Sequence, residues 1–345
     1  MPIHNRENIG STPDWAYGAK VLSALYSDMP NLLRMRNEFG ATALILYCCP
    51  ELTNSWCPSG TWEEVATFIK AAHNNSLKVV GYYDTTLVEA AFHAGHEAWT
   101  QRNADGMEQS YQPAHVQPRR HAYCFKSPWS ARVQDIAGRY MRAGADGVFL
   151  DNPNYYEFAG KACFCAFCQK KFRQESGKDL KVADDQERIG FLKRSIQDHV
   201  LRVFDSICRA AGGRLQPALL CNSAGSIPTN CLATLGSCEN VLFREMFPGG
   251  KEQGAALKEE RAEFPDKPLW VILTEGSGAK SWASDIDLAA MEFDAILEEI
   301  SSIGASPMVW STIPSQDPLR PGFTEHSIFV HPQLADVVKK HFLKH

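Results

Sequence analysis

The sequence predicts an α/β protein, a (β/α)8 TIM barrel with long βα loops, formed by a single catalytic domain over residues 1–345. Short apolar or β-branched runs alternate with longer helical patterns, an alternation typical of parallel βαβ units. Eight such runs favour a closed barrel over an open, doubly wound sheet. We expect strands at residues 21–27, 43–48, 79–84, 147–151, 217–222, 240–245, 269–275 and 307–311.

Helical patterns separate these strands, and two connections are unusually long. We expect helices at residues 61–74, 129–142, 184–211, 251–264, 285–303 and 332–343. The connections at 85–126 and 152–180 both leave the carboxyl ends of strands, and loops of that length in a compact barrel usually line a site. No glycine-rich phosphate-binding motif follows the first strand, which weakens a nucleotide-binding alternative.

Composition and charge narrow the class of protein further. The formal net charge of −5 provides no basic field, so we expect no nucleic-acid partner. No stretch approaches 18 continuous apolar residues and the N-terminus has no apolar segment, so neither a membrane span nor a signal peptide is expected. Eleven cysteines, an odd number, indicate reduced thiols and a cytoplasmic location.

Acidic residues stand at the ends of four expected strands: Asp84, Asp151, Glu245 and Glu275. The last residues of barrel strands converge over one mouth, where barrel enzymes carry their chemistry. Crowded carboxyls shift one another's pKa values, so one can stay protonated as an acid while another stays ionised as a nucleophile. For any single one of them, a helix cap or an ion pair with a nearby arginine is the alternative.

Rings and polar groups near the same strand ends suit the apolar faces and hydroxyl edges of a sugar. The aromatic residues there are Tyr82, Tyr83, Trp56, Tyr155, Tyr156, Phe247, Trp282 and Trp310. Any one ring is equally explained by core or rim packing. The residues that we expect to bind substrate are Trp56, Tyr83, Asp84, Arg120, His121, Asn152, Asn222 and Trp310.

Three cysteines in a Cys-x-Cys-x-x-Cys pattern, Cys163, Cys165 and Cys168, predict a structural zinc site. Cys124 at the end of the other long loop is the best fourth ligand, with Cys57 in reserve. Four protein ligands leave no open position for catalysis, so the ion would join the two loops. Free, redox-active thiols are the alternative. The spacing around His96 lacks the pattern of zinc deaminases.

The same segments resemble glycoside hydrolases. The zinc-bearing segment of family 42 β-galactosidases is similar to Arg119-Arg120-His121…Cys124…Ser127-Pro128, then Asp151-Asn152, then Cys163-x-Cys165-x-x-Cys168-x-x-x-Phe172. Those enzymes place an Asn-Glu acid/base at the end of strand four. Here Asn152 is followed by Pro153, so that glutamate is missing.

The chain resembles more closely the "hypothetical glycosyl hydrolase 6" group, related to the α-galactosidase and α-fucosidase barrels. That similarity covers roughly the first 250 residues and runs through Ser55-Trp56-Cys57-Pro58-Ser59, residues 81–84, His96…Trp99, Cys124…Trp129, residues 145–152, the three spaced cysteines and Glu245. The resemblance implies that Asp151, at the end of strand four, is the nucleophile. It also implies an acid/base on a later strand, where Glu245 is the natural counterpart. Glu275 is the second choice for either catalytic role.

The sequence therefore predicts a retaining, exo-acting glycosidase, or a transglycosylating relative, that acts on a small oligosaccharide or glycoside. A homo-oligomer is possible and its stoichiometry is left open. A metal-dependent sugar isomerase or lyase is a second hypothesis, in which His93, His96 and His121 bind a divalent ion with Asp84. A catalytically silent carbohydrate-binding barrel is the third.

Overall fold

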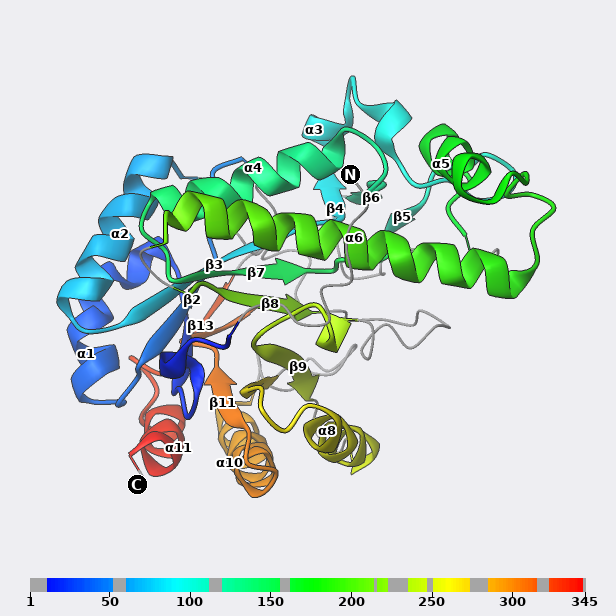
Figure 1. Ribbon diagram of the computed structural model, residues 1–345. Coiled ribbons are helices and arrows are strands. Elements are labelled where there is room, and N and C mark those ends of the chain that lie inside the picture. Colours follow the sequence, from blue (N-terminus) through cyan, green and yellow to red (C-terminus); the bar gives the residue numbers. More distant parts are fainter. Residues whose placement is uncertain are drawn as a thin grey trace.

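Eight parallel strands form one sheet that curls into a nearly closed barrel (Figure 1). The computed structural model describes residues 11–51, 60–111, 120–155, 162–213, 216–222, 235–246, 251–273, 285–314 and 323–343. The strand order β8-β7-β3-β2-β1-β11-β10-β9, with helices between the strands, confirms the expected (β/α)8 fold. The strands are β1 Val21–Ala24, β2 Ala43–Leu46, β3 Lys78–Asp84, β7 Gly147–Asp151, β8 Ala218–Asn222, β9 Leu242–Met246, β10 Leu269–Leu273 and β11 Ser306–Val309.

The long helices follow the expected pattern, and several expected ranges began at the residue that caps the helix. Thr61, Asp184 and Asp285 each accept a hydrogen bond from the first turn of the helix that follows, which makes them N-caps. The helices are α1 Leu32–Asn37, α2 Trp62–Asn74, α4 Trp129–Arg142, α6 Asp185–Ala211, α8 Lys251–Glu263, α10 Ile286–Ser302 and α11 Pro332–Phe342. Only the short helix α1 among these was not predicted.

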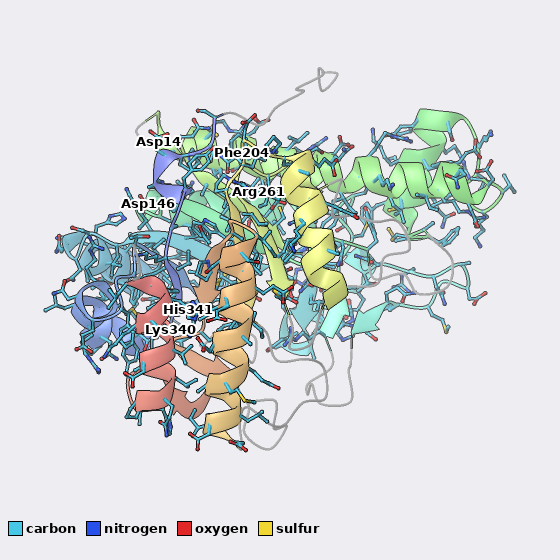
Figure 2. All side chains as sticks on the ribbon, turned by 90° about the horizontal axis from the view of Figure 1, so that it is seen from below. Asp14, Asp146, Phe204, Arg261, Lys340 and His341 are labelled. Atoms are coloured by element: carbon cyan, nitrogen blue, oxygen red, sulfur yellow. The ribbon has the colours of Figure 1, made fainter. Side chains whose placement is uncertain are left out.

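The helices cover the outside of the barrel. Helices α4 and α6 lie side by side along β7 (Figure 1). Helices α10 and α11 lie side by side on another flank, where Lys340 and His341 of α11 pair with Asp294 of α10 (Figure 2). Among the described residues, no helix combines the length and the apolarity needed to span a bilayer.

Both long connections contain secondary structure that the sequence patterns did not predict. A three-stranded antiparallel sheet, in the order β4-β6-β5, lies within the first, and helix α5 lies within the second. These and the remaining elements are β4 Leu87–Glu89, β5 Ser110–Tyr111, β6 Arg120–Ala122, β12 Thr312–Pro314, β13 Phe323–Ser327, α3 Ala90–His93, α5 Ala166–Ser176, η1 Asp14–Ala16, η2 Tyr26–Asn31 and η3 Glu97–Trp99.

Side chains link β8 to β9, where the register of paired strands is interrupted. The backbone amide of Leu219 donates to Asn240 Oδ1 at 2.8 Å, and the amide of Cys221 donates to Glu239 Oε2 at 2.8 Å. The expected strand began at residue 240, but β9 begins only at Leu242. The register with β10 begins at that residue, opposite Leu269, and before it the side chains of Glu239 and Asn240 supplement the backbone bond from Val241 to Leu219.

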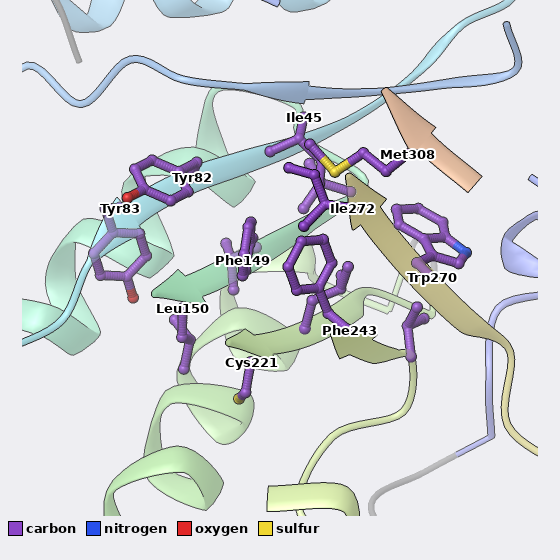
Figure 3. Packing of buried hydrophobic residues seen from close by; sticks show 14 of the residues in the cluster. Ile45, Tyr82, Tyr83, Phe149, Leu150, Cys221, Phe243, Trp270, Ile272 and Met308 are labelled. Carbon is purple, nitrogen blue, oxygen red and sulfur yellow. The ribbon is translucent and has the colours of Figure 1, made fainter. Parts of the chain in front are cut away.

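Residues two apart on a strand point to the same face, so the inward-facing side chains form layers, with a polar layer at the mouth above an apolar one. Asp84, Asp151 and Asn222 occupy one level in the register of β3, β7 and β8. Two residues earlier on β7, Phe149 points into the barrel, where its ring centroid lies 4.2 Å from that of Phe243 (Figure 3). The carboxyl and amide groups therefore rest on a closely packed apolar floor.

The outer face of β3 packs directly against α4. A Cβ atom added at Gly81 would lie 2.2 Å from the ring of Tyr140. The Tyr140 hydroxyl donates to the carbonyl oxygen of Tyr82 at 2.8 Å and also contacts the carbonyl of Cys48. Glycine at position 81 therefore lets α4 approach the strand that carries Tyr82 and Asp84.

We expect Gly81→Ala to lower the free energy of unfolding by about 1–3 kcal/mol, because the added methyl group overpacks a buried contact. Chemical denaturation measures this. Gly190→Ala is the matched control: on α6 the added carbon would come no closer than 3.3 Å to the tip of Arg194. Alanine is also the better helix former, so the control should be neutral or slightly stabilising. Equal stability of the two variants would contradict the packing argument.

Candidate active site

Four polar side chains meet at the mouth of the barrel, each at the carboxyl end of a strand. Asp84 ends β3, Asp151 ends β7 and Asn222 ends β8, while Glu245 is the penultimate residue of β9. Because parallel strands end at the same edge, residues separated by up to 161 positions in the chain become neighbours. The sequence predicted all four of them as site residues.

The Asn222 amide bridges two carboxyl groups. Its Nδ2 atom donates to Asp151 Oδ1 at 3.1 Å and to Glu245 Oε1 at 2.8 Å. The two hydrogens of an amide nitrogen diverge by about 120°, so ideal hydrogen bonds of these lengths place Asp151 Oδ1 and Glu245 Oε1 about 5 Å apart. A separation of about 5–5.5 Å is characteristic of retaining glycosidases, and inverting enzymes need about 6.5–9.5 Å.

Two donors contact the Asp151 carboxylate, one on each oxygen. The Tyr82 hydroxyl donates to Oδ2 at 2.6 Å, and Asn222 donates to Oδ1. Burial raises the pKa of Asp151, while these hydrogen bonds and the charge of Arg120 act in the opposite direction. Hydrogen bonds to both oxygens favour the ionised form, which is the form that a nucleophile requires.

The Glu245 carboxyl is in a different environment. Burial, with a further contribution from the negative charge of Asp151, raises the pKa of Glu245 to about 7, against a smaller lowering by Asn222. A substantial fraction of Glu245 is therefore protonated at neutral pH and can act as a proton donor, while Asp151 has a hydrogen-bond donor on each oxygen. Two carboxyls with unlike environments can serve as acid and nucleophile.

Asp84 is held by several donors. Its Oδ1 accepts from the amides of Thr86 at 2.9 Å and Leu87 at 2.8 Å, and its Oδ2 accepts from Asn152 Nδ2 at 3.1 Å. Arg120 Nη1 lies 4.0 Å from Oδ2. Burial and the charge of Asp151 nevertheless raise the pKa of Asp84 to about 7.

The backbone at Asn152 makes one of these contacts possible. Its φ angle is 53°, in the left-handed region that asparagine tolerates better than most side chains. The Asn152 amide donates to the carbonyl of Asn222 at 2.8 Å, so the turn after β7 is fixed on both sides. This turn directs the Asn152 side chain towards Asp84.

A row of rings lines the mouth beside the carboxyls. The ring of Trp310, which is 8% exposed, lies 4.8 Å from that of Tyr47, and Tyr47 stacks on Tyr82 at 4.2 Å. Sequence reasoning named Tyr82 among the rings near the strand ends but not among the expected substrate-binding residues, and it did not name Tyr47. Tyr82 stands two residues before Asp84, so strand alternation could have placed both on the same face.

Tyr83 is not part of this row. It is fully buried, its hydroxyl donates to the carbonyl of Val133 on α4 at 3.1 Å, and its ring stacks on Tyr140. The structure therefore places this expected substrate-binding residue between the barrel wall and α4. Two further expected site residues, Trp56 and Glu275, lie outside the described residues.

His121 and Arg120 are adjacent on β6 and therefore point to opposite faces of the small sheet. Arg120 approaches Asp84, whereas the His121 ring stacks on that of His93 at 3.5 Å. Glu108 Oε2 lies 3.2 Å from His93 Nε2 and 3.6 Å from His121 Nδ1. Two of the histidines expected in the metal-dependent hypothesis thus meet each other and Glu108, on the face away from Asp84.

The remaining histidine of that hypothesis lies elsewhere. His96 stacks on Phe92 at 4.5 Å and contacts the carbonyl of the same residue through Nδ1 at 2.9 Å. The structure therefore does not bring His96 and Asp84 into one ligand set with the other two histidines.

The four predicted cysteine ligands come together from the two long connections. The thiol sulfurs of Cys124, Cys163, Cys165 and Cys168 all lie within 4.8 Å of one another, and all four residues are buried. Cys124 and Cys168 are 3.3 Å apart at sulfur, too far for a disulfide bond of about 2.05 Å. Tetrahedral zinc with Zn–S bonds of about 2.3 Å places its sulfurs about 3.8 Å apart, so the cluster could hold such an ion.

We expect the purified protein to contain about one zinc ion per chain, since a cluster of four thiolates suits that metal. Elemental analysis measures it. Cys168→Ser should lower the metal content and the melting temperature, because the ion stabilises the folded chain. Cys208→Ser, at a partly exposed cysteine outside the cluster, is the control and should change neither. Full metal content in Cys168→Ser would exclude the site.

Fold and mouth together define a (β/α)8 barrel with a carboxyl pair at the ends of its fourth and sixth strands. The chain matches no protein-family model and no curated protein. It is similar to solved structures of glycoside hydrolases.

Three examples show the extent of this similarity. α-L-Fucosidase isoenzyme 2 from Paenibacillus thiaminolyticus has a TM-score of 0.61 and 14% identity over 95% of this chain and 49% of that one. The β-galactosidase from Bacillus circulans sp. alkalophilus has a TM-score of 0.66 and 12% identity, over 94% of this chain and 56% of that one. The β-galactosidase from Halorubrum lacusprofundi has a TM-score of 0.65 and 12% identity, over 94% of this chain and 58% of that one. The chain spans about half the length of these proteins, and the likeness shows the fold.

Proposed function

We propose that this protein is a retaining, exo-acting glycoside hydrolase in which Asp151 is the nucleophile and Glu245 the acid/base. The observation that carries the proposal is the Asn222 amide, which contacts both carboxyls at 3.1 and 2.8 Å and keeps them about as far apart as a double displacement requires. The glycosidase barrels that share the fold are consistent with it.

In the first half of the reaction an Asp151 oxygen attacks the anomeric carbon as the bond to the leaving oxygen breaks. Glu245 gives its proton to that oxygen. In the second half water attacks the same carbon, the bond to Asp151 breaks, and Glu245 accepts the proton of the water. The hydrogen bonds from Tyr82 and Asn222 suit Asp151 to the role of nucleophile, because they stabilise it as an anion and later as a leaving group.

The substrate that we propose is a small oligosaccharide or glycoside with one sugar ring at the mouth. The Trp310–Tyr47–Tyr82 row offers apolar surface for a sugar face. Asp84, Asn152 and Arg120 provide acceptors and donors for hydroxyl groups. We assign His121 no direct contact with the sugar, because it lies on the face of β6 opposite to that of Arg120. Transfer to a sugar acceptor in place of water uses the same residues.

Zinc at the four cysteines would be structural in this proposal. Cys124 follows β6, and Cys168 lies in α5, so an ion bound there would join the two long connections that surround the mouth. A filled tetrahedral site leaves no position for substrate, and no catalytic step is assigned to the metal.

We expect hydrolysis of at least one aryl glycoside in a panel of α and β anomers of galactose, fucose, glucose and arabinose. Glu245→Gln should lower kcat about 10²–10⁴-fold on substrates with poor leaving groups, since general acid catalysis is lost. Asp151→Asn should abolish turnover. Asp135→Asn, a carboxyl on α4 that pairs with Arg139, is the control and should retain full activity.

Other outcomes would redirect the assignment. Normal activity of Asp151→Asn would exclude it as the nucleophile. Loss of acid catalysis in Glu275→Gln with full activity in Glu245→Gln would move the acid/base to Glu275. Turnover that requires an added divalent ion would favour the isomerase or lyase, and sugar binding without turnover by the wild type would favour the silent barrel.

We also expect a basic limb near pH 7 in the pH profile of kcat/KM. Glu245 has a pKa raised to about 7, so the acid is present below this pH and is lost above it. In the same profile activity should fall at low pH as Asp151 becomes protonated. Glu245→Gln should remove the basic limb, whereas a limb unchanged in that variant would belong to Asp84, whose pKa is also about 7.

A further inference from the structure

A second concave site lies away from the barrel mouth, between α4, α5 and α6 on the outside of the barrel. The cavity has a volume of about 410 Å³. Helices α4 and α6 run side by side there, and α5 lies beyond the barrel near one end of α6 (Figure 1). Part of its wall is the segment from Phe125 to Ser127, which directly follows Cys124.

Positive charge dominates the cavity wall. Lys126, Lys170, Lys171 and Arg202 line it, together with a single carboxylate, Asp198. Two of the cations have carboxylate partners: Lys126 pairs with Asp198 at 3.2 Å, and Lys171 pairs with a glutamate on its own helix.

Lys170 and Arg202, both exposed, form no ion pair with any residue that the structure describes. They come from different helices, α5 and α6, and line the same cavity. Since like charges repel, two unneutralised cations around one hollow favour an anionic occupant.

Two buried polar side chains also line the cavity. His199 and Ser195, which are 2% and 1% exposed, contribute His199 Nε2 and Ser195 Oγ, and neither atom has a hydrogen-bond partner among the described residues. Buried polar groups are normally satisfied, so atoms of this kind point to a partner that is bound in solution.

The Ser130 hydroxyl links His199 to Gln134. Gln134 Nε2 donates to Ser130 Oγ at 3.3 Å, and that hydroxyl contacts His199 Nδ1 at 3.0 Å. When the hydroxyl donates to Nδ1, the proton of the neutral ring is on Nε2, which is then a donor towards the cavity. Burial and the charges of Lys126 and Arg202 lower the pKa of His199 to about 3, which keeps the ring neutral.

We propose that this cavity binds a phosphate group, carried by a small phosphomonoester. Donors on three separate helices and the β6–α4 connection match a tetrahedral group with several acceptor oxygens better than a planar carboxylate. The volume of about 410 Å³ exceeds what a single phosphate ion needs and lies in the range of small-molecule sites. The organic part of the ligand would occupy the remaining space.

Isothermal titration calorimetry of the 345-residue protein as purified, with inorganic phosphate and with glucose 6-phosphate, tests the proposal. We expect saturable binding of both probes, and at least about tenfold weaker binding in the double variant Lys170→Ala/Arg202→Ala, since two charge-assisted contacts are lost. Arg194→Ala removes an exposed arginine of the same helix that does not line the cavity, and it should bind as the wild type does.

The two probes separate the possible sources of the phosphate. Tighter binding of the ester would identify a phosphorylated small molecule, and equal binding would identify the free ion as sufficient. Failure of both probes to bind would overturn the proposal. So would unchanged binding in the double variant, because a phosphate held at the barrel mouth does not depend on Lys170 or Arg202.

Discussion

The amide of Asn222 holds together the two carboxyls on which the proposed chemistry depends. It donates to Asp151 on one side and to Glu245 on the other, across the seam between β8 and β9. Glu239 and Asn240 accept hydrogen bonds from the β8 backbone at that seam, and the amide of Val241 adds a backbone bond to Leu219. These contacts close the barrel next to the place where Asn222 bridges the proposed nucleophile and the proposed acid.

That closure requires a buried charge, and the fold compensates for it locally. Glu239 is fully buried, and Arg244 contacts both Glu239 and Glu260. A buried ion pair contributes little net stability, but removal of one partner leaves an uncompensated charge. Because Arg244 and Glu245 are adjacent on β9 and point to opposite faces, this network lies outside the barrel and Glu245, the proposed acid/base, lies inside. The seam can therefore be charged without adding a cation to the mouth.

The sequence was sufficient for the barrel and for three acids of its mouth, Asp84, Asp151 and Glu245, because an apolar run that ends in an acid marks both a strand and its exit. It selected Tyr83 for the substrate site where the structure places Tyr82 on Asp151, since the pattern of a strand buried on both sides does not reveal which residues face the interior. Nor could it predict β5, whose two residues carry no periodicity. Tertiary contacts bring β6 next to β5, and the same contacts bring Glu108 close to His121.

Cys124 shows why a four-cysteine cluster without an open position matters to the mouth. It directly follows Tyr123, whose amide donates to the carbonyl of Thr86 at 2.8 Å. The Thr86 hydroxyl in turn donates to the carbonyl of Asn152, and the Asn152 side chain donates to Asp84. An ion at the cysteines would therefore restrain the turn around Asp84, a residue of the proposed sugar pocket, while Asp151 and Glu245 are held by the barrel itself. The loops and the proposed catalytic pair have separate supports, so the proposed specificity could change without disturbing the proposed chemistry.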